Sequence, residues 1–377
     1  MIFGIPREIR AQERRVGAMP FLVKELVRRG HQVYVETGAG DFCEAADSQY
    51  ENVGATVVPS AEKLYSAAEI ILKVREPKPV EFELIKPDQA ILGFFHFMDN
   101  YERIKSLASR GCTCLAYEMV EDDRHHLPLL VPISQITGQL AVINGAYLLQ
   151  KHNLGRGIVL GRVTASPPAQ VLILGAGTVG KQAAVTAANL GACITVLDTD
   201  YHKLQELDQF GYHNISTLIS TDENLRTLLP KTDLFISCIQ IPNEKTPKLV
   251  TPEMVKAMRT GSVIVDVDID SGGTVETGKV THHDNPTFVV DGVVHYCVSN
   301  ITASVPMIAS RALSAALLPF LVQIAENSLE EAIQQNPTLA QGVAIYKGYV
   351  VKPHLARAVD MPLADLKKKI QELGPEI

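Results

Sequence analysis

The stretch VLILGAGTVGKQAAVTAANLGACITVLD (171–198) decides the fold of this chain. An apolar run leads into the glycine motif Gly175-x-Gly177-x-x-Gly180, an alanine-rich segment follows, and a second apolar run ends at Asp198. Gly175 permits a tight turn, Gly177 lets the backbone approach a pyrophosphate, and Gly180 lets the helix pack on the strand. The N–H groups at the start of the helix are suited to phosphate. The stretch therefore predicts a strand–helix–strand unit that binds a dinucleotide.

Asp198 indicates which dinucleotide is bound. It stands 18 residues after the last glycine of the motif, where a carboxylate can bond both ribose hydroxyls and would repel a 2′-phosphate. This favours NAD(H) over NADP(H). The alternative is a glycine turn in an α/β domain that binds no nucleotide, and the acidic residue at the expected distance argues against it.

Short apolar runs alternate with helical patterns on both sides of this stretch, which indicates βαβ units and mostly parallel sheets. We therefore expect an α/β fold of two doubly wound (Rossmann-like) domains around a cleft, linked by long helices. The expected domains are residues 1–130 plus 305–377, which would bind substrate, and 131–304, which would bind NAD. Strands are expected at 2–6, 31–37, 69–74, 90–95, 113–118, 171–175, 192–198, 233–239 and 262–270, and helices at 20–30, 100–111, 134–150 and about 303–327.

The remaining sequence patterns are less regular. The apolar stretch 304–325 contains Pro306, Arg311 and Pro319, so it is interpreted as a buried helix rather than a membrane span. From about Asn327 to the C-terminus the pattern is polar and loop-like.

Composition limits the partners and the compartment. The chain has 377 residues and a formal net charge of −7, so a protein that binds nucleic acid through a basic face is excluded. The N-terminus enters a charged segment too early for a signal peptide. Several of the six cysteines lie in apolar runs, and Cys112 and Cys114 are too close together for the usual zinc spacing. We expect a reducing cytoplasm, no membrane partner, no disulfide framework and no metal.

Polar side chains follow several of the expected strands, and ligands of parallel sheets bind beyond the carboxyl ends of strands. In the first half these residues are Arg15, Arg75, Glu76, His96 and Glu118, and in the second half Gln240, Asp270 and Asn300. From the residues alone, His96 is equally well a satisfied core histidine, and a surface cation is the default interpretation of each loop arginine.

Three carboxylates recur at every second position in Asp266-Val-Asp268-Ile-Asp270. In a continuous strand they would all face one way. Burying three such charges together is costly without a cation or protons. A divalent metal site is one interpretation, and fraying of the strand end is the one we favour.

Several motifs occur together in one order: GIPREIR (4–10), ERRV (13–16), LKVREP (72–77), ILGAGTVG (173–180), VDVDIDSGG (265–273) and HYCVSNITASVP (295–306). On these motifs the chain resembles the NAD-dependent alanine dehydrogenase family, whose fold is shared by the NAD-binding subunit of proton-translocating transhydrogenase. The resemblance runs from Met1 to about residue 350. It implies two α/β domains, reversible oxidative deamination of an amino acid to a 2-oxo acid, and assembly as a hexamer.

The resemblance also implies roles for individual residues. Arg15 matches the arginine that holds the substrate carboxylate, His96 the general acid/base, and Asp270 the carboxylate that assists ammonia addition. Arg75 stands where the family has a substrate-contacting lysine. The implied cofactor contacts, with the glycines above, are Ser134, Thr178, Val179, Asp198, Ser220, Ile239, Gln240, Val267, Asp268, Ile269, Asp270, Val298, Ser299, Asn300 and Ile301.

The chain departs from the family pattern at Arg75 and at Asp268, where a small apolar residue is usual. Arginine stays charged, so no neutral amine is available at position 75. Asp268 is a candidate partner for Arg75 or for an amino-bearing substrate. Three functions therefore remain open. They are an alanine dehydrogenase, a related enzyme acting on another amino acid or imine, and a non-catalytic NAD(H)-binding subunit like that of transhydrogenase.

Overall fold

The computed structural model describes residues 1–241 and 246–374. They form two compact units, residues 1–133 with 303–374 (unit 1) and residues 134–241 with 246–302 (unit 2). The chain first passes between the units inside α6 (Val131–Leu148) and returns at Thr302 and Ala303, within the short turn of helix η7 (Ile301–Ser304). The long helix α11 (Pro306–Glu326) therefore belongs wholly to unit 1.

Unit 1 contains an eight-stranded sheet in the order β15-β14-β6-β5-β4-β1-β2-β3. The six strands from β6 to β3 are parallel, and β14 and β15 extend the sheet in antiparallel pairs. Its strands are β1 (Ile2–Ile5), β2 (Gln32–Glu36), β3 (Thr56–Val58), β4 (Ile70–Arg75), β5 (Ala90–Phe94), β6 (Thr113–Ala116), β14 (Val343–Tyr346) and β15 (Tyr349–Val350).

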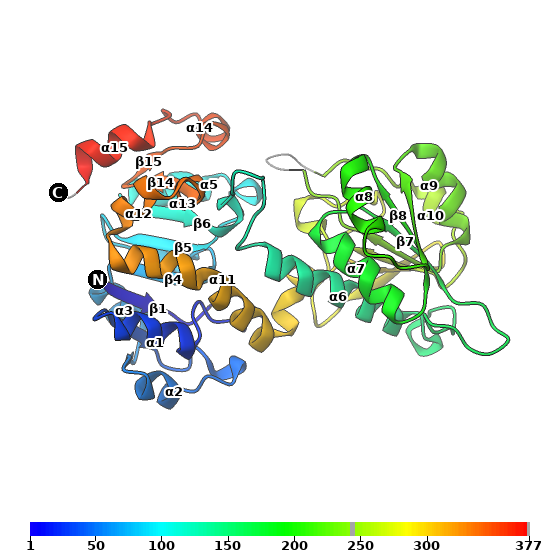
Figure 1. The fold of residues 1–377 in the computed structure, drawn as a ribbon, viewed down its shortest axis with the longest axis horizontal. Coiled ribbons are helices and arrows are strands. Elements are labelled where there is room, and N and C mark those ends of the chain that lie inside the picture. The colour runs from blue at the N-terminus through cyan, green and yellow to red at the C-terminus, as the bar shows by residue number, and fades with distance from the viewer. Residues whose placement is uncertain (242–245, 375–377) are drawn as a thin grey trace. The chain divides into compact units, whose positions relative to one another are not determined.

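The helices of unit 1 surround this sheet (Figure 1). They are α1 (Pro20–Arg28), α2 (Asp47–Asn52), α3 (Ala61–Ala67), α4 (Pro79–Phe82), α5 (Glu102–Ser109), α11, α12 (Leu329–Gln335), α13 (Pro337–Gly342), α14 (Pro353–Val359) and α15 (Leu366–Leu373). The strand order reverses between β1 and β4, because β2 and β3 continue to one side and β5 and β6 to the other. Such a switch point is where doubly wound folds bind ligands.

Unit 2 repeats the plan with seven strands in the order β12-β13-β11-β10-β7-β8-β9, and all but β12 are parallel. Here the order reverses between β7 and β10. The strands are β7 (Gln170–Leu174), β8 (Cys193–Asp198), β9 (Ile215–Ile219), β10 (Leu234–Ser237), β11 (Val263–Asp266), β12 (Thr287–Val290) and β13 (Val293–Tyr296). The helices, besides α6, are α7 (Thr178–Asn189), α8 (Tyr201–Asp208), α9 (Asp222–Leu228) and α10 (Pro252–Lys256).

Both faces of the unit 2 sheet are buried. Val171 and Ile173 of β7 belong to one apolar cluster, with the alanines of α7, whereas Leu172 and Leu174 belong to another, with Met254 of α10. Because successive side chains of a strand point to opposite faces, helices must cover both sides of the sheet. The predicted fold class, α/β with two doubly wound sheets, is confirmed.

The helix α11 has the length and apolar composition that would suit a membrane span, and it is the one helix of the described residues that does. A single such helix is weak evidence, because the core helix of a folded domain passes the same test. Leu313, Leu317 and Leu321 are buried along one stripe, and α11 packs on α1 and α12. Ser310 and Ser314 accept hydrogen bonds at 2.9 Å from the backbone N–H groups of Val16 and Met19. The helix thereby anchors the segment that follows Arg15.

Two sequence-based predictions of secondary structure are wrong. The C-terminal segment, interpreted as loop-like, folds into α12 to α15 and the strands β14 and β15. The strand expected at 262–270 ends at Asp266, and Asp270 lies in a short 3-10 helix, η6 (Ile269–Ser271). The carboxylates at 266, 268 and 270 therefore do not share one strand face, and the structure agrees with an early end of the strand.

Candidate functional site

The polar residues predicted in the first half gather at the carboxyl ends of the unit 1 strands. Arg15 belongs to the loop after β1, Arg75 ends β4, His96 follows β5, and Glu118 follows β6. These strands are neighbours in the parallel part of the sheet, so their carboxyl ends lie along one edge. We call these residues, together with Glu13 and Glu76, the strand-end cluster.

Arg15 is held by a carboxylate of its own loop. Its Nε and Nη2 donate to the two carboxylate oxygens of Glu13 at 2.7 and 2.6 Å, and both residues are buried. Burial alone would lower the pKa of Arg15, but the charge of Glu13 raises it above the ordinary value. The bidentate pair uses the Nε–Nη2 edge of the guanidinium and fixes its plane.

The end of β4 is fixed by a buried ion network. Lys73, fully buried, places Nζ at 2.8 Å from Glu81 Oε1 and 3.3 Å from Glu8 Oε2. Burial would lower the pKa of Lys73, but the charge of Glu8 and other anions raises it, so the ammonium persists. Glu8 Oε1 accepts from the backbone N–H of Val74 at 2.7 Å and of Arg75 at 3.3 Å. The network therefore positions the backbone that carries Arg75.

Glu76, only 2% exposed, is the centre of a group of cations. Arg75 Nε donates to one of its oxygens at 3.0 Å, and the other oxygen accepts from Lys78 and Arg10 at 3.2 and 3.3 Å. The same oxygen forms an ion pair with Arg103 Nη2 at 3.4 Å. Burial would raise the pKa of Glu76, but these charges, Arg75 first, hold it below the usual value. One carboxylate against four cations leaves the group around Glu76 positively charged, as an anionic substrate requires.

His96 sits in a left-handed turn at the end of β5, with φ +45° and ψ +52°. The carboxylate of Glu118 accepts from the backbone N–H of Phe95 at 3.1 Å and of His96 at 2.6 Å. Arg103 Nη1 donates to the carbonyl oxygens of the same two residues. The imidazole stacks on the ring of Phe94, with centroids 6.1 Å apart. Both the donors and the acceptors of this turn are thus bonded to side chains.

The titration of this region is set by burial and by the arginines. Burial lowers the pKa of His96 well below its ordinary value, and the charges of Arg75, Arg10, Arg103 and Arg15 lower it further. Burial also raises the pKa of Glu118 to about 7, although the bonds from the two backbone N–H groups oppose this. At neutral pH the imidazole is therefore neutral, and Glu118 is the carboxyl that titrates.

The glycine motif of unit 2 has the geometry of a phosphate-binding loop. Gly175 has φ +106°, and a Cβ at Gly180 would lie 1.8 Å from the carbonyl oxygen of Gly175. At Gly177 no described atom would lie within 4 Å of an added Cβ, so this position faces open space. Thr178 and Val179 begin α7, and Lys181 is bonded back to the Gly177 carbonyl. The N–H groups of the first turn are thus directed away from the helix.

Asp198 ends β8 next to this loop. Its Oδ2 accepts from the backbone N–H of Ala176 at 2.6 Å and its Oδ1 from that of Asp200 at 2.8 Å. Each carboxylate oxygen has two acceptor sites, so both ribose hydroxyls can still be bonded. Ser220, after β9, donates its N–H to the Asp198 carbonyl oxygen at 2.9 Å. The arrangement fits a dinucleotide.

The other predicted cofactor contacts follow the remaining parallel strands of unit 2, along the same edge of the sheet. Ser134 lies one helical turn before Gly138 of α6, where a Cβ would lie 2.4 Å from the Val179 carbonyl oxygen. Ser134 is therefore on the side of α6 that approaches the start of α7. The strand-end residues are Ile239 and Gln240 after β10, Val267, Asp268, Ile269 and Asp270 after β11, and Val298, Ser299, Asn300 and Ile301 after β13.

The three carboxylates of this segment differ in environment. Asp266 is buried, Asp268 partly buried and Asp270 exposed. Burial raises the pKa of Asp266 to about 6. Burial, with the charges of Asp266 and Asp270, raises the pKa of Asp268 to about 7. Among the described residues no group of three His, Cys, Asp or Glu side chains could hold a metal ion.

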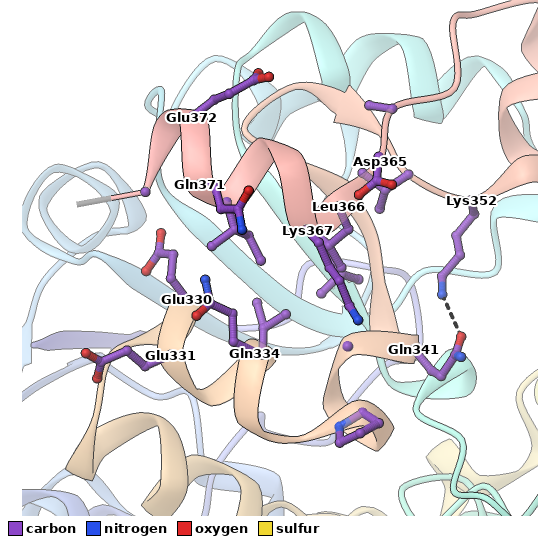
Figure 2. Close-up of a pocket in the computed structure, with 18 of the residues that line it drawn as sticks. Glu330, Glu331, Gln334, Gln341, Lys352, Asp365, Leu366, Lys367, Gln371 and Glu372 are labelled. Carbon is purple, nitrogen blue, oxygen red and sulfur yellow. Dashed lines mark hydrogen bonds between the residues drawn. The ribbon is translucent and has the colours of Figure 1, made fainter. Parts of the chain in front are cut away.

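A separate hollow of about 1300 Å³ lies in unit 1, where α15 passes over α12 and α13 (Figure 2). Lys352 donates to Gln341 Oε1 across it at 3.0 Å, and burial lowers the pKa of Lys352 to about 8. Acidic and amide side chains supply much of the rest of the wall, and no residue of the strand-end cluster lines it. We therefore place the candidate site at the strand ends.

Two residues of the cluster have partners that the sequence did not predict. No sequence pattern assigns a role to Glu13 or Arg103, yet Glu13 holds Arg15 and Arg103 holds the His96 turn. Glu13 had a weak signal, since it shares a loop with Arg15 after the first strand. Arg103 had none, because it lies on α5 among other charged residues, and only the fold brings it to β5.

A parallel sheet with a glycine loop at its switch point and an acidic residue ending the next strand defines a dinucleotide-binding protein. Two family descriptions match the chain: "Alanine dehydrogenase/PNT, N-terminal domain" over residues 4–137, and "Alanine dehydrogenase/PNT, C-terminal domain" over residues 141–353. The chain belongs to the alanine dehydrogenase/PNT family. Dehydrogenases of this family use a nicotinamide cofactor in general.

Individual relatives agree with this assignment over their full length. An alanine dehydrogenase of Methanococcus maripaludis is 40% identical, covering 99% of this chain and all of that protein. A solved L-alanine dehydrogenase superposes with a TM-score of 0.91 at 40% identity, covering 96% of this chain and 99% of that one. A solved transhydrogenase from Sinorhizobium meliloti has a TM-score of 0.80 at 27% identity, covering 94% and 99%.

Proposed function

We propose that this protein is an NAD-dependent alanine dehydrogenase, which converts L-alanine, water and NAD⁺ reversibly to pyruvate, ammonium, NADH and a proton. The observation that carries the proposal is the placement of a neutral imidazole, His96, on the same strand edge as Arg15 and Arg75. The two arginines can bind an anionic substrate, and the imidazole can exchange a proton with it. The full-length likeness to proteins named alanine dehydrogenase supports the choice of substrate.

Arg15, Arg75 and His96 of the strand-end cluster, together with Asp270 of unit 2, have tasks in this reaction. Arg15 binds the substrate carboxylate, with its plane held by Glu13, and Arg75 adds a second fixed positive charge. In the direction of deamination the neutral imidazole of His96 accepts a proton from the reacting oxygen, and in the direction of amination the imidazolium returns that proton to the oxygen. Asp270 assists the addition of ammonia. NAD(H), when bound, supplies the hydride acceptor or donor.

NAD(H) would be held by unit 2. The N–H groups at the start of α7 face its pyrophosphate, and Asp198 bonds the adenine ribose. The strand-end residues from Ser220 to Ile301, together with Ser134 on α6, would contact the rest of the cofactor. The open position at Gly177 supports this assignment, because it leaves room for a ligand against the backbone.

The proposal is tested by following NADH oxidation at 340 nm with ammonium and a panel of 2-oxo acids. We expect turnover with pyruvate, the reverse reaction with L-alanine, and little activity with NADPH. Turnover of another 2-oxo acid in preference to pyruvate would favour the second candidate, a dehydrogenase retuned at Arg75 and Asp268. NADH binding without any turnover would favour an NAD(H)-binding subunit, to which the likeness to the S. meliloti transhydrogenase points.

Replacing Asp198 with alanine is expected to raise KM for NADH by about 10–100-fold, as the loss of charge-assisted hydrogen bonds implies, and to narrow the preference for NADH over NADPH. Asp198→Asn is the matched control, because it removes the charge but keeps an oxygen for the N–H of Ala176. KM values for both cofactors measure the effect. An unchanged preference in the alanine variant would contradict the assignment of Asp198 to the ribose.

We also propose a homohexamer in the cytoplasm, on the family resemblance. Free thiols at all six cysteines, five of them buried, are consistent with a reducing compartment. Light scattering of the purified protein tests the hexamer.

A further inference from the structure

We propose that Glu118 and Arg103 are positioning residues for His96, which hold the turn of Phe95 and His96 in the conformation that aims the imidazole at the substrate. This inference rests on the proposed function and adds two residues to it. Neither residue has been assigned a contact with substrate or cofactor above. Their effect on the reaction is exerted through the His96 backbone.

The first argument is conformational. The left-handed backbone at His96 is disfavoured for residues with a side chain, and it persists only where the surroundings impose it. Here both N–H groups of Phe95 and His96 donate to Glu118, and both carbonyl groups accept from Arg103. Two side chains on separate elements, the segment after β6 and α5, thus bond all four backbone polar groups of the turn.

The second argument is the connection to the substrate-binding residues. Arg103 also reaches Glu76 through Nη2 at 3.4 Å, and Glu76 accepts from Arg75 Nε at 3.0 Å. A chain of direct contacts therefore runs from Arg75 through Glu76 and Arg103 to the His96 turn. The chain links the cation proposed to face the substrate anion to the backbone that carries the proposed acid/base.

The third argument concerns the ionisation of Glu118. Its Oε1 accepts from both backbone N–H groups, and a carboxylate accepts such bonds more strongly than a neutral carboxylic acid does. Arg75 is the charged side chain that acts on Glu118, and Arg10, Arg15, Arg75 and Arg103 act on His96. Protonation of Glu118 as the pH falls through about 7 is therefore expected to loosen the turn.

The experiment compares Glu118→Ala, Glu118→Gln and Arg103→Lys. Glutamine keeps an oxygen where Oε1 lies, so it retains both hydrogen bonds without the charge, whereas alanine retains neither. Glu69→Ala is the matched control, because Glu69 Oε2 accepts from the Ile2 N–H at 2.8 Å at the start of β1. We measure kcat, KM for pyruvate and NADH, the pH profile of kcat/KM, and the rate at which diethyl pyrocarbonate modifies His96, by peptide mass spectrometry.

We expect Glu118→Ala to lower kcat by about 10–100-fold, the range found when the hydrogen-bond partners that orient a metal-bound histidine are removed, with KM for NADH unchanged. Glu118→Gln is expected to restore part of kcat, because its neutral amide oxygen accepts both bonds more weakly than a carboxylate does, and to lose the ionisation near pH 7. Arg103→Lys is expected to lower kcat less than Glu118→Ala does, because the lysine ammonium still carries a positive charge and N–H donors although it lacks the guanidinium geometry. The His96 modification rate should change in Glu118→Ala and not in Glu69→Ala.

The proposal would be overturned if Glu118→Ala kept the wild-type kcat, pH profile and His96 modification rate and lost only thermal stability, as Glu69→Ala does. Failure of the glutamine variant to restore kcat would also count against positioning through hydrogen bonds. If the wild-type protein turns over no 2-oxo acid, the proposed function fails instead, and the modification rate of His96 still decides whether Glu118 holds the turn.

Discussion

The His96→Asn variant is expected to lose about 10²–10⁴-fold in kcat for the amination of pyruvate, the usual worth of a general acid/base. Asparagine is the most selective replacement. It tolerates the left-handed backbone that His96 adopts, and it cannot exchange a proton near neutral pH. The turn held by Glu118 should therefore survive the substitution. NADH affinity should change by less than about twofold, since the cofactor is assigned to unit 2, and fluorescence titration measures it.

The control for this variant is His31→Asn. His31 also lies in unit 1, next to the amino end of β2 rather than among the carboxyl ends, and burial lowers its pKa as well. We expect it to keep wild-type kcat. If His96→Asn keeps more than a tenth of the wild-type kcat, His96 is not the acid/base, and Glu118 becomes the next group to examine.

The sequence predicts the centre of unit 2 well because its signals are local. The glycine motif and Asp198 are fixed by backbone approach and by hydrogen bonding within one strand–helix–strand unit. The predictions are weak where tertiary contacts determine the secondary structure. Edge strand β9 is half-exposed, with the pattern ISTLI and no continuous apolar run, so it was not expected. Strands β14 and β15 exist because β14 pairs with β6, more than 200 residues earlier.

The candidate site divides in the same way. Arg15, Arg75 and His96 are predictable, because each follows a strand that an apolar run announces. The environment of these residues is not predictable. No spacing in the sequence shows that Arg103 of α5 donates to the carbonyl groups after β5, or that Glu76 contacts four cations. Burial lowers the pKa of His96, with the nearby arginines adding to the shift, and burial raises the pKa of Glu118, so the protonation states of the site follow only from the fold.

The Arg15→Ala variant is expected to lose both activity and about 3–5 kcal/mol of unfolding free energy. Glu13 is buried, and it would lose the two charge-assisted hydrogen bonds, at 2.7 and 2.6 Å, that accompany its burial. Arg15 is also the proposed holder of the substrate carboxylate, so kcat/KM for pyruvate should fall even where the protein remains folded. Urea denaturation and initial-rate kinetics measure the two effects separately.

Arg15→Lys and the double variant Glu13→Ala/Arg15→Ala separate the structural role of Arg15 from its role in binding. Lysine keeps a charge but cannot bond both oxygens of Glu13 at once, so an intermediate loss of stability is expected. The double variant leaves no buried carboxylate without its partner, so it should be more stable than Arg15→Ala alone. With the single variant Glu13→Ala it completes the cycle that measures the coupling of the pair. Its activity should nevertheless stay as low as that of Arg15→Ala, because removing Glu13 cannot return a guanidinium to the substrate. Recovery of activity along with stability would mean that Arg15 serves only to neutralise Glu13, and the substrate carboxylate would then have to be assigned to Arg75.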